Sequence, residues 1–371
     1  MVLLDVAFYA LIVVVLIQVF FFLHLFRKFA YFKENEINKN SETPVSVIIC
    51  AKNEAENLKV FLPSVINQEY KDFQIVLIND ASKDDTLSVM ETFAASASNI
   101  KIVDVKQVES FWGNKKYPLT LGIKASEHDI LLFTDADCKP LSKYWISEMV
   151  SRINQDTSIV LGYGAYAKIK GSFLNKLIRF ETLTTAISYA SMAIAGSPYM
   201  GVGRNLAYTK SQFFKINGFI KHINILSGDD DLFVNAAATA VNTTICFSQN
   251  AWTESMPKTT FKSWFKQKRR HVSTAKNYKL KHKIILFLLY TTNFLFWALS
   301  ILLLVFWFAP IYVIGLILIR MVCQFFIFMA CAKKLNENDV IPLFSILEIF
   351  LILFQLAIFI TNLIKKPNHW K

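Results

Sequence analysis

Residues 129–137 read DILLFTDAD, an apolar run that ends in two aspartates one residue apart. A short apolar run of this kind, bounded by polar residues, predicts a buried strand. Three similar runs precede it along the chain: SVIIC (46–50), FQIVLI (73–78) and KIVDV (101–105). The gaps between these predicted strands are long enough to hold one helix each.

Helix-start patterns lie in two of the gaps. Asn53 and Glu56 form an N-x-x-E capping pattern, and Ser82 with Asp85 opens a second predicted helix. Strands that alternate with capped helices are typical of an α/β fold with a doubly wound, mostly parallel sheet. Ligands of such sheets bind beyond the carboxyl ends of the strands.

Polar side chains follow three of the predicted strands: AKNE (51–54), NDAS (79–82) and DAD (135–137). Two carboxylates one residue apart, on a strand that leaves a sheet, can both turn toward one cation. Hard divalent cations such as Mg²⁺ and Mn²⁺ bind one or two carboxylates together with substrate phosphates. Asp135 and Asp137 are therefore the predicted metal ligands.

A second acidic motif, SGDDDL (227–232), places three consecutive aspartates at the start of a helix predicted over residues 231–240. One interpretation is an acidic cluster that complements the helix dipole. The other is a general base, which takes a proton from an attacking hydroxyl. Crowded carboxylates raise the pKa of at least one of them toward neutral pH, and this favours the base.

The 371 residues are 54% hydrophobic, whereas soluble domains contain about 45–50%. This composition excludes a disordered chain. Arg27 and Lys28 follow the first long apolar run, so the part after that run is expected in the cytoplasm. One N-terminal and about three C-terminal transmembrane helices are predicted from runs long enough to span a bilayer: residues 6–26, 284–308, 311–331 and 341–363.

The last apolar run, residues 341–363, has two possible placements. If it crosses the membrane, Lys365, Lys366 and Lys371 lie outside, against the charge rule. Either such a short tail is tolerated, or the run lies partly re-entrant or at the interface.

A basic segment, residues 258–283, carries ten Lys or Arg and no Asp or Glu. Phe261, Trp264 and Phe265 recur among these cations at helical spacing. The pattern predicts an interfacial amphipathic helix, with its apolar side in the acyl boundary and its cations toward anionic headgroups. The alternative is a solvated basic helix.

Four motifs together resemble those of the family 2 glycosyltransferases, which have a GT-A fold: SVIICAKNE (46–54), LINDASKDDT (77–86), NKKYPLTLGI (114–123) and LLFTDADC (131–138). The resemblance covers roughly residues 44–275. It implies transfer of a sugar from a nucleotide donor, usually a uridine diphosphate sugar, with inversion at the anomeric carbon.

The resemblance also implies roles for single residues. Asp80 matches the acid that contacts uracil, and Lys115 matches a basic residue near the nucleotide. Asp135 matches the carboxylate on the ribose and metal side, and Asp137 matches the direct metal ligand. The predicted donor-binding residues are Asn53, Glu54, Asp80, Lys115, Asp135, Gln267, Arg270 and His271.

Two further motifs extend the resemblance. The stretch Q-K-R-R-H is similar to the Q-x-x-R-W motif of cellulose, chitin and hyaluronan synthases, with Gln267 and Arg270 matching and His271 in place of Trp. Arg270 would then stabilise the diphosphate leaving group. The G-D-D segment is similar to the acceptor-side motif and implies Asp230 as the catalytic base, with Asp229 beside it.

The sequence thus predicts an N-terminal anchor (1–31), a GT-A domain (32–257), a basic interfacial helix (258–283) and a C-terminal transmembrane region (284–371). The protein is predicted to reside in the plasma (inner) membrane, with its catalytic domain in the cytoplasm. It uses Mg²⁺ or Mn²⁺ to transfer a sugar from a nucleotide-diphosphate donor to a hydroxyl of a membrane-associated glycan or lipid. The alternative acceptor, a polyprenyl phosphate, needs little base catalysis because it is already ionised.

Two other classes of protein are less consistent with the sequence. A nucleic-acid-binding protein would also use the basic segment, but residues 32–257 are near neutral, with 22 basic and 24 acidic side chains. A transporter would show broken helices or internal repeats, and neither occurs in the sequence. We therefore expect a nucleotide sugar, a membrane acceptor and the bilayer as partners, and no nucleic acid.

Overall fold

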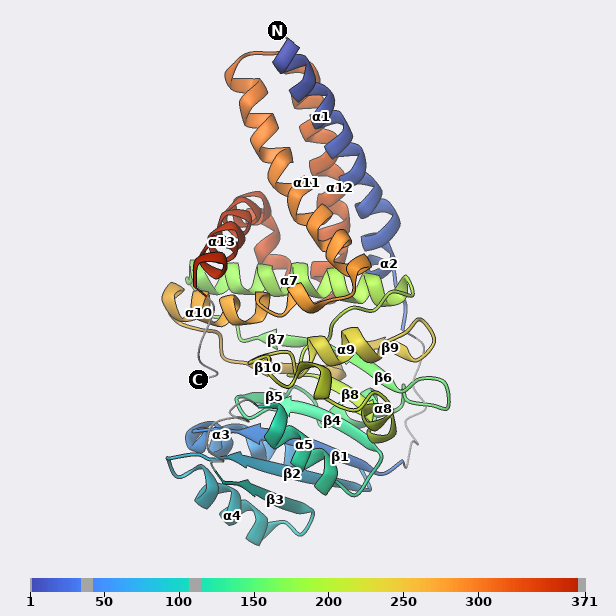
Figure 1. Cartoon of the computed structure of the whole chain (residues 1–371), viewed down its shortest axis with the longest axis vertical. Coiled ribbons are helices and arrows are strands. Elements are labelled where there is room, and N and C mark those ends of the chain that lie inside the picture. Colours follow the sequence, from blue (N-terminus) through green and yellow to red (C-terminus); the bar gives the residue numbers. More distant parts are fainter. Residues whose placement is uncertain (1, 35–42, 107–114, 366–371) are drawn as a thin grey trace.

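The computed structural model describes residues 2–34, 43–106 and 115–365. Figure 1 shows the chain in three tiers along its long axis: an α/β domain at the bottom, a layer of helices above it, and a bundle of long helices at the top. The apolar runs of the sequence therefore gather at one end of the molecule.

A mixed sheet forms the centre of the α/β domain. Across the described ranges, seven strands run in the order β3-β2-β1-β4-β8-β6-β9. The first four are parallel to one another, β8 is antiparallel to β4 and β6, and β9 is parallel to β6. The predicted α/β fold with a mostly parallel sheet is confirmed. The strands are β1 (Val45–Ala51), β2 (Phe73–Asp80), β3 (Ile100–Val105), β4 (Ile130–Asp135), β6 (Ile159–Gly162), β8 (Leu206–Thr209) and β9 (Thr243–Cys246).

The four predicted strands all form, and their ends lie within two residues of the predicted ones. Side chains of a strand alternate between the faces of its sheet. Ile48 of β1 accordingly enters one core, while Val47 and Ile49 enter the other, because both faces of this sheet are covered. Cys50 lies opposite Ile78 in β2 and Asp135 in β4, so the polar residues after these strands share one edge.

The predicted capping pattern at Asn53 is wrong. Asn53 has a left-handed backbone (φ +55°), and the next helix begins at Ala55, whose N–H donates to Asp84 Oδ2 at 3.3 Å. The Asn53 N–H itself donates to Ser82 Oγ at 3.0 Å. Polar side chains therefore join the loops after β1 and β2 to each other. Helices and short strands of this domain are α3 (Ala55–Ile66), α4 (Thr86–Ser96), α5 (Lys116–Ala125), α6 (Trp145–Val150), α8 (Lys210–Lys215), α9 (Asp231–Ala237), β5 (Cys138–Pro140), β7 (Gly164–Tyr166) and β10 (Thr253–Ser255).

Two helices, α7 (Phe173–Ile194) and α10 (Phe261–Val272), lie between the sheet and the bundle (Figure 1). Helix α7 buries residues on both of its sides because it contacts the sheet below and the long helices above. Helix α10 is shorter than the basic segment. A 3-10 turn (Ala275–Asn277) follows it, and α11 begins at Leu280 rather than at residue 284.

In the described part of the chain, four helical segments are long and apolar enough to cross a membrane, as predicted: Val2–Ala30, Leu280–Val305, Pro310–Lys334 and Asn338–Ile364. The first segment consists of α1 (Val2–Phe20), a π-helical turn (Phe21–Phe26) and α2 (Arg27–Ala30), and α1 packs with α11 (Leu280–Val305) and α12 (Pro310–Lys334) (Figure 1). Ala309 has a left-handed backbone (φ +44°) in the tight turn between α11 and α12. The intramembrane charges Arg320 and Glu348 are buried and paired at 2.8 Å.

The last helix, α13 (Phe344–Ile364), contacts α11 and α12 through Glu348 near its start and then runs along α10. Trp264 of α10 stacks on Phe354 with ring centroids 3.9 Å apart, and Arg269 Nε donates to Asn362 Oδ1 at 2.9 Å. Trp264, which the sequence analysis placed in the acyl boundary, is fully buried in protein. That expectation is wrong for Trp264 because a second helix from the C-terminal region covers it.

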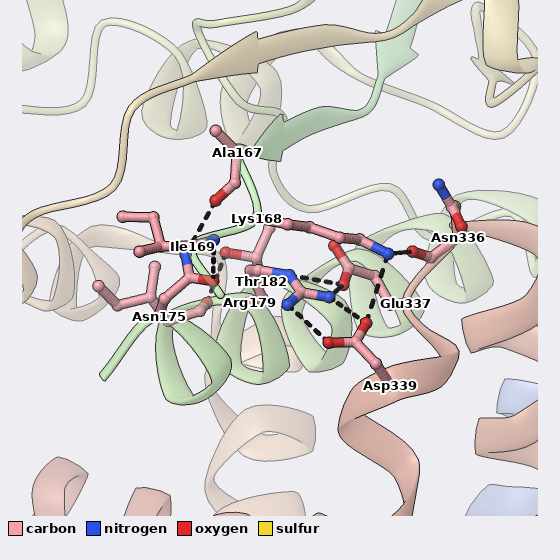
Figure 2. A network of polar contacts seen from close by, with 10 residues as sticks. Ala167, Lys168, Ile169, Asn175, Arg179, Thr182, Asn336, Glu337 and Asp339 are labelled. Carbon is pink, nitrogen blue, oxygen red and sulfur yellow. Dashed lines mark hydrogen bonds and ion pairs between the residues drawn. The ribbon is translucent and has the colours of Figure 1, made fainter. Parts of the chain in front are cut away.

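A polar network joins α7 to the segment after α12 (Figure 2), with Arg179 and Glu337 buried at its centre and Lys168 and Asp339 exposed. The Arg179 guanidinium donates to Glu337 Oε2 at 2.8 Å and to Asp339 Oδ2 at 2.9 Å. Lys168 forms an ion pair with Asp339 at 3.3 Å. Removing one partner of a buried pair costs about 3–5 kcal/mol. The network therefore holds the α/β domain and the membrane helices in one relative orientation.

Candidate active site

The end of β2 carries Asp80, a predicted donor-binding residue. Lys52 Nζ lies 3.3 Å from Asp80 Oδ2. The neighbouring Asn79 donates its side-chain amide to Asp104 Oδ1 at 2.7 Å and accepts from the Ser82 N–H. The ends of the first three strands are thus tied together around Asp80, at the edge where the fold predicts a ligand.

Asn53 and Glu54 lie in the loop between β1 and α3. The Asn53 side-chain oxygen accepts from the Lys83 N–H at 2.8 Å, and the Glu54 N–H donates to Thr86 Oγ1 at 2.8 Å. Both residues thereby connect their loop to the one after β2. The fold brings them to the same edge as Asp80, and their contact with a donor stays a prediction.

The candidate metal ligands lie close together after β4. One potential ligand atom from each of Asp135, Asp137 and Cys138 lies within 4.8 Å of the others. Burial and the neighbouring Asp135 carboxylate raise the pKa of Asp137. Crowded carboxylate oxygens of this kind suit a hard divalent cation, which would relieve their repulsion. The residues present therefore fit Mg²⁺ or Mn²⁺, and Cys138 is a neighbour that the prediction did not include.

Lys115 lies at the centre of the site. Its ammonium group forms ion pairs with Asp135 Oδ1 at 2.6 Å and with Asp229 Oδ2 at 3.2 Å. Burial opposes its charge, but these two carboxylates hold the pKa of Lys115 well above its usual value. Burial alone would raise the pKa of Asp135. The positive charge of Lys115 stabilises the carboxylate, however, and the pKa of Asp135 is lowered. Lys115 thus connects the candidate metal site to the acidic motif.

The three consecutive aspartates have three different environments. Asp229 pairs with Lys115. Asp230 Oδ2 accepts from the Gly203 N–H at 2.7 Å. Asp231 is buried and accepts from the hydroxyl groups of Thr274 and Tyr278. The charge of Asp229 is thus balanced by Lys115, and Asp231 is hydrogen-bonded to the segment that leads into the membrane helices.

The pKa of Asp230 lies near neutral pH. Burial, reinforced by the charges of Asp229 and Asp231, raises its pKa to about 7. A carboxyl that titrates near neutral pH can accept a proton from a hydroxyl, and effective general bases titrate near the working pH. Lys115, Asp229, Asp230 and Gly203 line a single small cavity. The geometry therefore brings the candidate base next to the residues predicted to contact the donor.

Gln267, Arg270 and His271 lie on α10, where Arg270 and His271 are adjacent and both follow Gln267 by about one helical turn. Arg270 is close enough to Asp135 to lower that carboxyl's pKa. Burial, together with the cations Lys268 and Arg270, holds the pKa of His271 well below its usual value, so its imidazole is neutral. Arg270 and His271 are thus brought within electrostatic reach of the strand ends, and the role of Gln267 stays a prediction.

Two cations near the metal site were missed by the sequence analysis. Arg204 donates to the carbonyl oxygens of Ala165 (3.0 Å) and Gly164 (2.8 Å) and lies 4.1 Å from the centre of the Tyr166 ring. Arg204 and Lys258 both act to lower the pKa of Asp137. The only sequence signal was the G-V-G stretch before Arg204, which does not reveal its distant partners.

The fold defines a GT-A-like α/β domain joined to helices that are long and apolar enough to cross a membrane. In agreement, residues 46–219 match the sequence profile described as "Glycosyl transferase family 2". This domain of the chain belongs to glycosyl transferase family 2.

Relatives and a solved structure are consistent with that assignment. The probable glycosyltransferase YdaM of Bacillus subtilis is 27% identical over 73% of this chain and 68% of its own length. An uncharacterized glycosyltransferase of Haemophilus influenzae is 32% identical over 34% of this chain and 37% of its own length. The mannosyltransferase PcManGT from Pyrobaculum calidifontis, solved with GDP-Man and Mn²⁺, has a TM-score of 0.61 at 14% identity, over 93% of this chain and 99% of that one. This likeness shows the fold.

Several curated relatives are matched over only part of their length. The chain covers 37%, 35% and 25% of three of them. The match therefore identifies the family of the domain, while the substrates of the whole protein do not follow from it.

Proposed function

We propose that the protein is an inverting glycosyltransferase that transfers a sugar from a nucleotide-diphosphate donor to a hydroxyl group of a membrane-associated glycan or lipid. The observation that carries this proposal is Asp230, whose raised pKa of about 7 suits a general base. It lines the same cavity as Lys115, which pairs with Asp135 of the candidate metal site. A base for the acceptor thus lies beside the residues for the donor.

The proposed chemistry is a single displacement. The Asp230 carboxylate takes the proton of the acceptor hydroxyl, whose oxygen forms the new bond to the anomeric carbon. The bond from that carbon to the donor phosphate breaks on the opposite face, so the configuration inverts. The nucleoside diphosphate leaves with the electron pair. Arg270, Arg204 and Lys258 provide positive charge near the place where negative charge develops on it.

Asp135 and Asp137 would hold a divalent cation against the donor diphosphate. The oxygen ligands favour Mg²⁺ or Mn²⁺, and the PcManGT structure, which has the same fold, contains Mn²⁺. The bound cation would neutralise charge on the leaving diphosphate. The same structure contains GDP-Man, so both guanosine and uridine diphosphate sugars are candidate donors, with uridine favoured by the motifs.

The acceptor is proposed to carry a hydroxyl because an already ionised polyprenyl phosphate has no need of Asp230. Helices α7 and α10 lie between the sheet and the long apolar helices (Figure 1). This position favours an acceptor at the membrane surface. The test is to incubate membranes containing the protein with a panel of labelled UDP- and GDP-sugars and to extract the product. Transfer to a hydroxyl-bearing product supports the proposal, and labelling of a lipid phosphate alone contradicts it.

The rate of transfer should depend on pH through Asp230. Its folded-state pKa is raised to about 7, so the carboxyl is protonated and inactive as a base below that pH. The turnover number should rise as the pH passes through about 7. The measurement is the pH profile of turnover at saturating donor. A profile that is flat between pH 5.5 and 8 would contradict a base with this pKa.

The C-terminal end of the chain should lie on the same side of the membrane as the α/β domain. Helix α11 leads away from the α/β domain, α12 leads back toward it, and α13 then lies along α10. Lys365, the last residue that the structure describes, then obeys the charge rule, whereas Lys366 and Lys371 lie outside the described residues. The measurement uses a fluorescent or phosphatase reporter fused after residue 371.

The control for this topology experiment places the same reporter between α11 and α12, near Ala309. It should report the opposite side of the membrane from the C-terminal fusion. Two reporters on the same side would show that α13 crosses the membrane.

A further inference from the structure

Lys116, the first residue of α5, is an unusual buried lysine. Its side chain is 1% exposed. Its ammonium group donates to the carbonyl oxygens of His222, Ile225 and Ser227 at 2.9, 2.6 and 2.6 Å. Lysine is almost never fully buried unless its charge is satisfied. Here it is satisfied by the backbone of one loop, so its three hydrogens hold three points of that loop, residues 222–227.

This loop leads directly into the candidate base. Ser227 precedes Gly228, which has a left-handed backbone (φ +94°), and a Cβ at Gly228 would lie 2.5 Å from Leu232. The turn into Asp229 and Asp230 is therefore tight, and a shift at Ser227 would be passed on to both carboxylates.

Lys115, the residue before Lys116, contacts the other end of this turn. Lys115 forms an ion pair with the Asp229 carboxylate at 3.2 Å, while Lys116 holds the Ser227 carbonyl two residues earlier. Two consecutive lysines at the start of α5, Lys115 just before the helix and Lys116 as its first residue, thus hold the side chain and the backbone of the acidic turn. Since Lys115 also binds Asp135, the turn is fixed relative to the candidate metal site.

We propose that Lys116 is a positioning residue whose ammonium group holds loop 222–227 and thereby keeps Asp230 in place to deprotonate the acceptor. This inference rests on the proposed base role of Asp230. The hydrogen bonds from its ammonium group to three carbonyl oxygens of this loop are the contacts through which it acts.

The protonation of Lys116 gives this role a distinct signature. Burial lowers its pKa to about 8, against the opposing charges of Asp229, Asp231 and Asp230. The nearby titratable His222 has its own pKa lowered, first by burial and then by Lys116, so it is neutral near pH 8. Above about pH 8 the lysine loses its charge and one of its three donors. Turnover should therefore fall at alkaline pH as the loop loosens.

The experiment uses the full-length protein in detergent and compares Lys116→Met with Lys124→Met. Lys124 lies on the same helix and is exposed, so it is the matched control. Amide hydrogen exchange of residues 222–231 is measured together with UDP–Mn²⁺ affinity and turnover. For Lys116→Met we expect exchange in this loop to be about tenfold faster. Turnover should fall about 10²-fold, the size associated with a misplacement of roughly 1 Å. UDP–Mn²⁺ affinity should stay within a few-fold of wild type.

Lys116→Arg provides the second measurement and does not depend on the folding of the Met variant. Arginine stays charged at all accessible pH values. This variant should therefore keep turnover at neutral pH and lose the fall above pH 8. Unchanged loop exchange in Lys116→Met, or an alkaline fall that persists in Lys116→Arg, would overturn the proposal.

Failure of the proposed function is seen separately from failure of this inference. If the wild-type chain transfers no sugar from any donor, the function is wrong, and hydrogen exchange still reports whether Lys116 holds the loop. If exchange rises while turnover is unaffected, the loop is tethered but does not position a catalytic group, and the inference is wrong.

Discussion

Asp230→Asn is expected to slow sugar transfer by about 10²–10⁴-fold, the usual cost of losing a general base. Asparagine is nearly isosteric, and its side-chain oxygen can still accept from the Gly203 N–H, which Asp230 binds at 2.7 Å. It cannot take a proton from the acceptor, so the substitution separates base chemistry from packing. UDP–Mn²⁺ affinity should stay within a few-fold, because Asp80, Lys115 and the two candidate metal ligands are unchanged. The measurement is turnover and nucleotide affinity of the purified variant.

The neighbouring aspartates test whether the base is assigned to the correct residue. Asp231→Asn weakens the contacts to Thr274 and Tyr278, so we expect it to lower thermal stability more than turnover per folded molecule. Asp129→Asn, at the opposite end of β4, is the matched control and should behave as wild type. If Asp230→Asn is active and Asp229→Asn is inactive, the base is Asp229 and not Asp230. Normal turnover in all of these variants would favour an ionised phosphate acceptor.

Asp137→Ala is expected to abolish both transfer and its dependence on divalent metal. Loss of one carboxylate from a site built on two leaves the bound diphosphate without its counter-charge. The nearby Arg204 cannot replace the metal ion, because its guanidinium is already engaged with backbone carbonyls. The measurement is Mn²⁺-dependent turnover, together with Mn²⁺-dependent binding of UDP, which reports the site without catalysis.

Asp156→Ala, in an exposed loop, is the control for loss of one aspartate and should keep both Mn²⁺-dependent turnover and Mn²⁺-dependent binding of UDP. A variant of Asp137 that keeps more than about a tenth of wild-type turnover has lost less than ~1.4 kcal/mol in its barrier. Such a small loss would contradict its assignment as a direct metal ligand.

The local sequence was sufficient to predict the strands whose ends form the edge that carries the candidate active site. The runs at residues 46–50, 73–78, 101–105 and 129–134 became strands because each is short, apolar and bounded by polar residues. Parallel strands end at one edge, so Asp80 and Asp135 had to lie at that edge wherever the rest of the chain went. The long apolar runs likewise had to leave water, and this predicted the four helices.

Partners that are distant in the sequence were decided by the tertiary structure. The three consecutive aspartates look alike in sequence, yet Lys115 neutralises Asp229, while hydroxyls more than 40 residues away bind Asp231. Burial, which also raises the pKa of Asp231, combines at Asp230 with the charges of Asp229 and Asp231 and raises the pKa of Asp230 to about 7. In the same way, nothing near Lys116 in the sequence predicts that it is buried against the carbonyl oxygens of loop 222–227.

The placement of the last apolar helix shows the same limit. Composition predicted that residues 341–363 avoid water, and it left open whether they cross the membrane or lie along it. Contacts with a separate helix, in which Phe354 stacks on Trp264 and Asn362 binds Arg269, favour a placement along the membrane, which the reporter fusions test. Sequence by itself determined which segments are strands, membrane helices and acidic strand ends, because periodicity, hydropathy and residue type are local properties. Tertiary structure decided which carboxylate can act as a base and which surface covers each helix, because burial and ion pairing depend on residues that meet only when the chain folds.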